Sequence, residues 1–184
     1  GVKTYEADLP CCIRYWLDSG FHIAEGDKIK LLYLDIEVDD SVSGLKIGQD
    51  TILSFAAVDS DGKEYQFINE NIDDPNCEKQ LLKKVMNLID KYDLMVGWNS
   101  KGYDIPYIKA RCKKYGIKWQ YFAHVDMMQR MIHAYRFDTQ IKSFSLNNIA
   151  QQFLGKSKPR TMKIIELFKN HHADFLKYNL TDVL

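Results

Sequence analysis

The sequence has 184 residues, and its 25 Lys and Arg balance 25 Asp and Glu, so the formal net charge is zero. This balance argues against a protein that coats nucleic acid without specificity, which would carry a basic excess. A content of 46% hydrophobic and 12% aromatic residues excludes a disordered chain. No apolar run approaches the roughly 20 residues that span a bilayer, so we expect a soluble globular domain with no membrane partner. The four cysteines form no CxxC pair, which favours reduced cytosolic thiols over a zinc site.

Strands and helices alternate along most of the chain, after an irregular lead-in over residues 1–27 that contains a short helical pattern at Ile13–Asp18. We expect strands at Ile29–Val38, Thr51–Val58, Glu64–Ile68, Leu94–Trp98 and Ala123–Asp126. We expect helices at Cys77–Lys91, Ile105–Tyr115, Met127–Tyr135, Ser145–Leu154, Met162–Phe168 and Ala173–Leu184. The first three strands form an antiparallel meander, which predicts an α/β fold with a mixed sheet flanked by helices. Because the last helix reaches the chain end without a cap, we expect a domain excised from a larger protein.

The first strand carries two carboxylates near its C-terminal end. Asp35 and Glu37 are two residues apart and therefore project from the same face of the strand. Leu31 and Tyr33 lie on this face nearer the start of the strand, where we expect it to be buried. Adjacent carboxylates repel each other, and a divalent cation is the usual compensation. The alternative is that the strand end is simply solvated.

Two further segments carry polar residues in suggestive places. Asp104 follows a short strand that ends at Trp98, where open α/β sheets collect ligands, although this segment alone favours Asp104 as the N-cap of the helix that follows. Tyr178 and Asp182 are one helical turn apart and share a face with Phe175. An opposite stripe is apolar, so one stripe should pack on the sheet and the other should face a site or a neighbouring domain. The alternative is a core or interface tyrosine with a solvated Asp.

Together the three segments form a specific pattern. They read Asp-x-Glu at Asp35 and Glu37, Asn-x3-Tyr-Asp at 99–104, and Tyr-x3-Asp at 178–182. This order resembles the Exo I, Exo II and Exo III motifs of the DEDD nuclease superfamily, in its tyrosine subgroup, with a DnaQ-like, ribonuclease-H-like fold. The lead-in at 4–20, the run His124–Met127 and the stretch 145–156 are similar to family B DNA polymerases, of archaeal type most of all.

The resemblance implies a 3′–5′ proofreading exonuclease domain over residues 28–184, preceded at 1–27 by part of the polymerase N-terminal region. It implies two divalent cations, Mg²⁺ or Mn²⁺, with Asp35 bridging them. Glu37 and Asp182 would complete one coordination shell, and Asp104 would hold the second ion. Tyr178 would orient the attacking water.

The resemblance also implies the partners. Asn99 and Tyr103 would hold a single-stranded or frayed 3′ primer end of DNA, although the family more often has Phe at the position of Tyr103, and Asn99 could instead serve a structural turn. The remaining polymerase domains would be further partners. The location would be cytoplasmic, and nucleoid-associated in an archaeon or bacterium. Two alternatives remain open: an RNA-trimming exonuclease of the same superfamily, and a catalytically silent scaffold domain.

Other polar residues are predicted to have structural or surface roles. Asp126 is expected to make a structural hydrogen bond. His171 and His172 are expected on the surface, because the histidine variant of these nucleases has its His at the position of Lys177. A basic loop formed by Lys156, Lys158, Arg160 and Lys163 is expected to be solvated, with DNA contact as the alternative.

Overall fold

The computed structural model describes residues 28–41, 46–156 and 163–184. The lead-in with its helical pattern at Ile13–Asp18, and the middle of the basic loop, therefore lie outside the described residues. Five strands form one sheet of order β3-β2-β1-β4-β5. The strands are β1 (Leu31–Val38), β2 (Ile52–Asp59), β3 (Glu64–Ile68), β4 (Leu94–Gly97) and β5 (Ala123–Asp126).

The predicted mixed sheet is confirmed. β1 pairs antiparallel with β2, and β2 pairs antiparallel with β3, which is the expected meander. On its other side β1 pairs parallel with β4, and β4 pairs parallel with β5. The central strand β1 and its neighbour β4 therefore end at the same edge of the sheet, so the loops that follow them lie close together.

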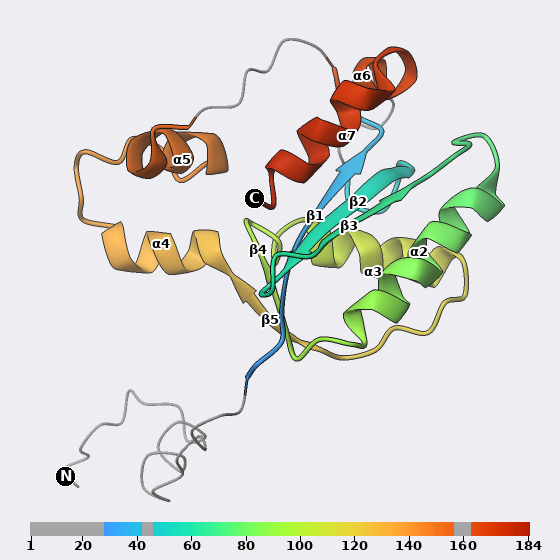
Figure 1. Ribbon diagram of the computed structural model, residues 1–184, viewed down its shortest axis with the longest axis horizontal. Coiled ribbons are helices and arrows are strands. Elements are labelled where there is room, and N and C mark those ends of the chain that lie inside the picture. The colour runs from blue at the N-terminus through green and yellow to red at the C-terminus, as the bar shows by residue number, and fades with distance from the viewer. Residues whose placement is uncertain (1–27, 42–45, 157–162) are drawn as a thin grey trace, which may run out of the picture.

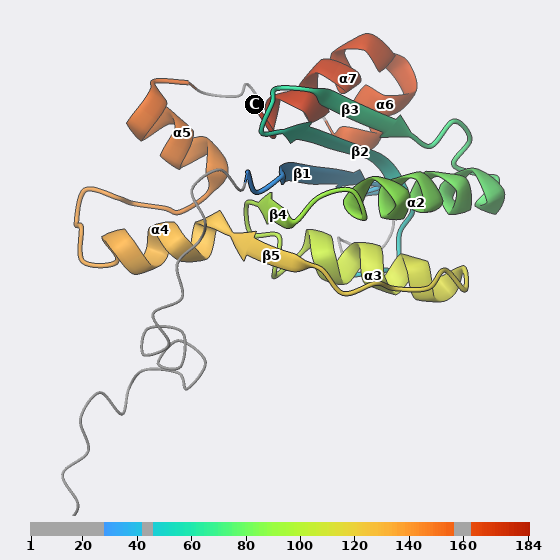
Figure 2. The same ribbon diagram turned by 60° about the horizontal axis from the view of Figure 1, so that its bottom comes forward.

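Helices cover both faces of the sheet (Figures 1 and 2). In chain order, the helices of the described residues are α2 (Pro75–Ile89), α3 (Asp104–Lys114), α4 (Met127–Tyr135), α5 (Leu146–Leu154), α6 (Ile164–Asn170) and α7 (His172–Thr181). One face packs on α2 and α3 around Leu34, Phe55 and Leu82, which belong to the larger apolar core. The other face packs on α6 and α7 through a smaller core of Leu53, Ile164, Ile165 and Phe175.

Helix boundaries differ from the expected ones by a few residues where capping decides them. Asp74 caps α2 by accepting a hydrogen bond from the backbone N–H of Asn76, so this helix begins at Pro75 instead of Cys77. α7 ends at Thr181, and Asp182 is its C-cap residue. The expected continuation of this helix to Leu184 is therefore wrong, as is common at helix ends that fray.

One expectation about the central strand is also wrong. Tyr33 is predicted to lie in a buried part of the acidic face, but 38% of its surface is exposed. α6 and α7 contact β1 but leave this side chain exposed. Among the described residues, no helix combines the length and apolar character needed to cross a membrane.

A buried ion pair joins α2 to α3. The side chains of Glu78 and Arg111 are each 1% exposed and form a bidentate pair, with Arg111 Nε donating to Glu78 Oε1 at 2.7 Å. The hydroxyl of Tyr115 and the backbone N–H of Ile52 also donate to the Glu78 carboxylate. Arg111 in turn donates to the carbonyl oxygens of Gly48 and Gln49, so the pair holds the segment before β2 against both helices.

Candidate active site: carboxylates at the end of the central strand

Asp35 and Glu37 lie on the face of β1 that α6 and α7 cover, and both are half-buried. In the antiparallel register Asp35 lies opposite Ala56, and Glu37 lies opposite Ser54. Small partners on β2 leave room beside the two carboxylates. A register shift between Glu37 and Val38 ends the regular pairing at this point. Such bulges re-aim side chains next to functional sites.

Asp182 joins these two carboxylates from the end of α7. One carboxylate oxygen from each of Asp35, Glu37 and Asp182 lies within 4.8 Å of the others. Three acids so close together repel one another unless a cation or protons compensate. Their donor set consists of oxygen alone, which suits hard cations such as Mg²⁺ and Mn²⁺ and disfavours zinc. The residues present therefore fit a divalent metal site.

α7 is held against the sheet by contacts on the same helix face that carries Tyr178. Phe175 is fully buried and packs in the core with Leu53 of β2. The side-chain Nε2 of Gln66, on β3, donates to the carbonyl oxygen of Leu176 at 2.7 Å. This docking brings the half-buried Tyr178 and Asp182 over the end of β1. One stripe is predicted to pack on the sheet and the other to face a site, but the stripe of Phe175, Tyr178 and Asp182 does both.

The four predicted acids and Tyr178 line one cavity of about 240 Å³. Its wall also includes Asn99 and Tyr103, so every predicted site residue borders the same space. Their assignment as catalytic or metal-binding residues stays a prediction, because proximity alone does not establish a role. Residues from opposite ends of the described chain meet here. The C-terminal ends of β1 and β4 lie at the same edge of the sheet, and the end of α7 lies beside them.

Asp104 lies at the back of this cavity and is 3% exposed. Asp104 is the first residue of α3, and the N-cap residue of this helix is Tyr103. Asp104 Oδ1 accepts a hydrogen bond from the backbone N–H of Ile36, on β1, at 3.2 Å. The alternative interpretation of Asp104 as a helix cap is therefore wrong. Tertiary packing against β1 decides its position.

The pKa of the Asp104 carboxyl is raised from an ordinary 3.8 to about 7, chiefly by burial and also by the negative charges of Asp126 and Asp182. The backbone N–H groups of Asp104 itself and of Ile36 oppose this shift by stabilising the carboxylate. A site that holds a carboxyl group in this state is poised to gain from a cation, because a bound cation favours the ionised form.

We expect Asp104→Asn to stabilise the metal-free protein in a pH-dependent way. The raised pKa means that folded Asp104 retains a proton that the unfolded chain releases, so the stability of the wild type falls as pH rises from about 4 through 7. Asn keeps the acceptor for Ile36 and removes this loss. In EDTA, the difference in unfolding free energy should be near zero at about pH 4 and grow to a few kcal/mol by about pH 8. Urea titrations at each pH measure it, with the exposed Asp73→Asn as control. A pH-independent difference would contradict the expectation.

The loop between β4 and α3 has a backbone that few residues can adopt. Asn99 has a φ of 56°, in the left-handed region that Asn tolerates better than most residues. At Gly97, an added Cβ would lie 2.6 Å from the side chain of Ser100 and 3.2 Å from the Leu34 carbonyl oxygen. Asn99 thus has a structural role in this turn, which was the alternative to a contact with substrate. A contact with substrate stays a prediction.

Asp126 holds this loop from the end of β5, as its predicted structural role requires. It is 6% exposed, and its two oxygens accept hydrogen bonds from the backbone N–H groups of Asn99 and Lys101 at 3.0 and 3.1 Å. It also caps α4 through the N–H groups of Met128 and Gln129. A single carboxylate therefore determines where the loop lies relative to α4.

Tyr103 is half-buried beside Tyr107, with ring centroids 5.4 Å apart. Burial raises the pKa of its hydroxyl, and the nearby charges of Asp104 and Glu37 add to the effect. The hydroxyl is therefore neutral and available as a hydrogen-bond donor at neutral pH.

Asp40, Trp98 and Ile164 also line the cavity and were not anticipated as site residues from the sequence. Asp40 Oδ1 accepts a hydrogen bond from the N–H of Ile165, in the first turn of α6, where Lys163 provides no side-chain cap. Trp98 Nε1 donates to the carbonyl oxygen of Phe144 at 3.1 Å. In the sequence, only the pair of acids after β1, Asp39 and Asp40, could have indicated that Asp40 lies near a site. Both hydrogen bonds join distant segments, which local patterns do not reveal.

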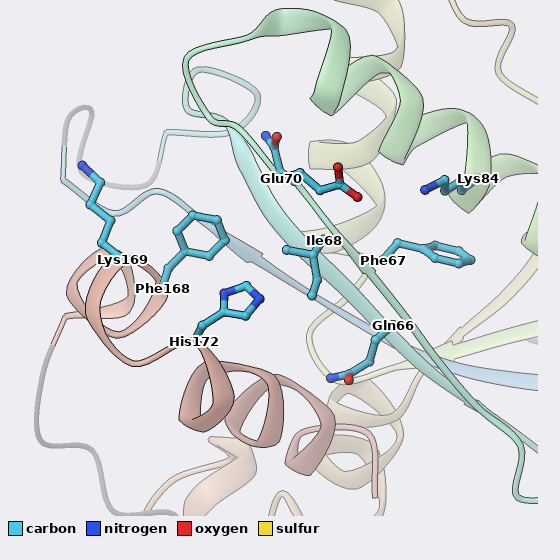
Figure 3. A pocket seen from close by; sticks show the side chains of 9 residues that line it. Gln66, Phe67, Ile68, Glu70, Lys84, Phe168, Lys169 and His172 are labelled. Carbon is cyan, nitrogen blue, oxygen red and sulfur yellow. The ribbon is translucent and has the colours of Figure 1, made fainter.

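A larger hollow of about 580 Å³ lies where the edge strand β3 meets α6 and α7 (Figure 3). Its lining mixes Glu70 with Lys84, Lys169 and His172, so no cluster of acids forms there. His171 and His172 are exposed, as predicted, and the ring of His172 packs edge-on against Phe168 with centroids 6.0 Å apart. This hollow shows none of the geometry expected of a metal site.

The topology of the sheet and the position of the acids define a nuclease-like domain of the ribonuclease H type. The chain belongs to the RNase H superfamily, whose family model matches residues 32–184. A solved structure of the family B DNA polymerase from the hyperthermophilic archaeon Pyrobaculum calidifontis has the same fold, with a TM-score of 0.72 at 22% identity. That match covers 97% of this chain and 30% of the polymerase.

Curated proteins of similar sequence are also DNA polymerases. A DNA polymerase of Methanocaldococcus jannaschii is 24% identical over 98% of this chain, and that of Thermococcus hydrothermalis is 31% identical over 64%. The DNA polymerase of Thermococcus sp. strain 9oN-7 is 32% identical over 64%. The chain spans 13%, 7% and 16% of the lengths of these relatives, respectively. The predicted relationship to archaeal DNA polymerases is thereby confirmed, and the RNase H-like fold is shared with a family B member.

Proposed function

We propose that this chain is a metal-dependent 3′–5′ exonuclease domain that hydrolyses 3′-terminal nucleotides of DNA as the proofreading part of a DNA polymerase. The observation that carries the proposal is the convergence of Asp35, Glu37 and Asp182 at the end of the central strand. It is supported by the homology to DNA polymerases. Residues 28–184 would form this domain, and 1–27 would belong to the preceding polymerase region. The location would be cytoplasmic.

A phosphodiester is anionic and has a poor leaving group, so its hydrolysis needs charge neutralisation and an activated water. A pair of Mg²⁺ or Mn²⁺ ions would supply both. Asp35, Glu37 and Asp182 are the residues that would hold one ion, with Asp35 shared between the two. Asp104 would serve the second ion from the back of the cavity.

The remaining residues would bind and orient the substrate. Tyr178 borders the cavity together with Asp182, so its hydroxyl could hydrogen-bond the attacking water. Asn99 and Tyr103 border it from the loop before α3, where they would contact the terminal nucleotides by hydrogen bonding and stacking. Asp104 is 3% exposed, so its electrostatic interactions are screened less by bulk water than those of an exposed carboxylate.

The test is incubation of the protein with a 5′-labelled single-stranded DNA oligonucleotide, with Mg²⁺ or Mn²⁺ and with EDTA. Stepwise shortening from the 3′ end that requires the cation is the expected result. An RNA oligonucleotide of the same sequence in parallel distinguishes a DNA exonuclease from an RNA-trimming enzyme. Absence of shortening, together with absence of Mn²⁺ binding by calorimetry, would identify a silent scaffold and reject the proposal.

Replacement of Tyr178 tests the role of its hydroxyl separately. We expect Tyr178→Phe to lower kcat by about 10- to 100-fold, because a hydrogen bond to the reacting water is worth roughly 1.5–3 kcal/mol. KM and Mn²⁺ affinity should stay unchanged, since the ring and the carboxylates are retained. Steady-state kinetics with calorimetry separates these quantities. An unchanged kcat, or a parallel decrease in Mn²⁺ affinity, would exclude an orienting role.

A further inference from the structure

A second hollow, of about 350 Å³, lies on the other side of the loop that carries Asn99 and Tyr103. We call it the aromatic-lysine hollow. Its lining includes Lys101, Lys109, Trp119, Tyr121, Phe122 and His124. Lys101 lies between Asn99 and Tyr103 in the sequence, so one loop forms a wall of both the candidate active site and this hollow. Asp126 and α3 hold that wall in place.

The aromatic lining combines the exposed Tyr121 with Trp119 and Phe122, which are half-buried against the larger core. The rings of Trp119 and Phe122 lie 5.2 Å apart at 53°, and Tyr121 is 98% exposed. An aromatic ring so fully exposed gains nothing from burial in this chain, so its flat faces are available to a planar ligand. Stacking of a nucleobase on such rings is tolerant of sequence, because every base has a π face.

The charge of the hollow is positive. Lys109 Nζ lies 5.9 Å from the ring centroid of Trp119, and Lys101 also belongs to the lining. No lining residue carries a carboxylate. His124 Nε2 and Ser100 Oγ share a hydrogen bond of 2.7 Å, and burial together with the charge of Lys101 lowers the pKa of His124, against the opposing effect of Asp126. An anionic ligand with flat aromatic groups matches this surface in both charge and shape.

We propose that the aromatic-lysine hollow is a second binding site for single-stranded DNA, with bases stacked on Tyr121 and Trp119 and phosphates on Lys101 and Lys109. The inference rests on the proposed function only for the choice of DNA as ligand. Because residues of the loop at 99–103 line both the candidate active site and this hollow, a strand bound at the first would extend across that loop to the second. The site would hold the strand during removal of successive nucleotides.

The experiment measures DNA binding without hydrolysis. The chain carrying Asp35→Ala is titrated against a fluorescently labelled oligothymidylate in EDTA, by anisotropy at several salt concentrations. We expect Tyr121→Ala in this background to weaken binding by about 5- to 100-fold, the range for removal of one stacked base. Tyr121→Phe should retain the affinity of its parent within about twofold, because the ring is kept. Melting temperatures of all variants show that the fold is intact.

The lysines are tested by a matched pair. Lys101→Ala with Lys109→Ala should weaken binding and lower the slope of log K against log salt by about 1.4, or about 0.7 for each phosphate that is no longer neutralised. Lys83→Ala with Lys91→Ala removes the same charge from exposed positions on and after α2, and should change the slope by less than half as much.

Three results would overturn the inference: no measurable binding by the parent at low salt, binding that is insensitive to Tyr121→Ala, or equal effects of the two lysine pairs. Each of them would show that the hollow is not a binding site for single-stranded DNA. A protein that binds DNA through the hollow but hydrolyses none would overturn the proposed function and leave this inference intact.

Discussion

Asp35→Ala is expected to reduce exonuclease activity by at least about 10³-fold. Asp35 belongs to the carboxylate cluster, and its replacement removes the proposed shared ligand of both ions. Metal ions contribute several kcal/mol to stabilising the charge of such a transition state, and each 1.4 kcal/mol is about a factor of ten in rate. Calorimetry should show the loss of Mn²⁺ binding as well. The fold should persist, because removal of one of three mutually repelling acids relieves charge repulsion in the metal-free protein.

The matched control is Asp73→Ala, which removes an exposed carboxylate from the turn before α2. This variant should retain the full rate and Mn²⁺ affinity. Activity of the Asp35 variant within about tenfold of the wild type, at saturating Mn²⁺, would reject the assignment of this cluster as the catalytic centre. Loss of activity in both variants would indicate a general effect of charge.

Arg111→Met is expected to lower the unfolding free energy by about 3–5 kcal/mol, because it leaves the buried carboxylate of Glu78 without its counter-ion. Glu78 is 1% exposed, so solvent cannot replace the missing charge. Tyr115 and the N–H of Ile52 still donate to it but carry no net charge. The segment before β2 is also deprived of the hydrogen bonds from Arg111 to the Gly48 and Gln49 carbonyl oxygens.

The double variant Glu78→Leu with Arg111→Met distinguishes charge burial from packing. It removes both charges at similar volume and should be closer to the wild type than Arg111→Met alone, since such apolar replacements are often neutral. Urea unfolding monitored by circular dichroism measures both, with Lys113→Met on the exposed side of α3 as control. If Arg111→Met and the double variant lower the unfolding free energy equally, the ion pair stabilises the fold through packing and hydrogen bonds, and not through the pairing of its charges.

The nuclease motifs could be predicted from the sequence because each depends on local geometry. Side chains alternate between the two faces of a strand, so Asp35 and Glu37 share one face of β1. Residues four apart share one face of a helix, so Tyr178 and Asp182 lie together at the end of α7. The meander was also predictable, since the turn at 59–62 and its two flanking strands are adjacent in the chain. The order of the motifs indicated the nuclease superfamily, and the stretches at 4–20, 124–127 and 145–156 indicated the archaeal polymerase relationship.

The pattern of charges and apolar residues could not reveal which interactions would form between distant segments. The sequence did not show whether Asp104 caps α3 or belongs to a functional site. The hydrogen bond that its carboxylate accepts from the N–H of Ile36 places it at the site. Likewise the apolar stripes of α7 did not indicate that Phe175 would pack on Leu53 while Tyr178 borders the cavity. The aromatic-lysine hollow could not be predicted, because its lining comes from two separate parts of the chain, 101–109 and 119–124.

The sequence by itself determined the order and type of the elements, the local pairs of site residues and the family, because these depend on neighbours within one turn or one strand. The tertiary structure alone decided that three acids meet within 4.8 Å, that Asp104 is buried with a raised pKa, and that one loop borders two hollows. The physical reason is that burial and electrostatic coupling arise only when the ends of β1, β4 and α7 come together at one edge of the sheet.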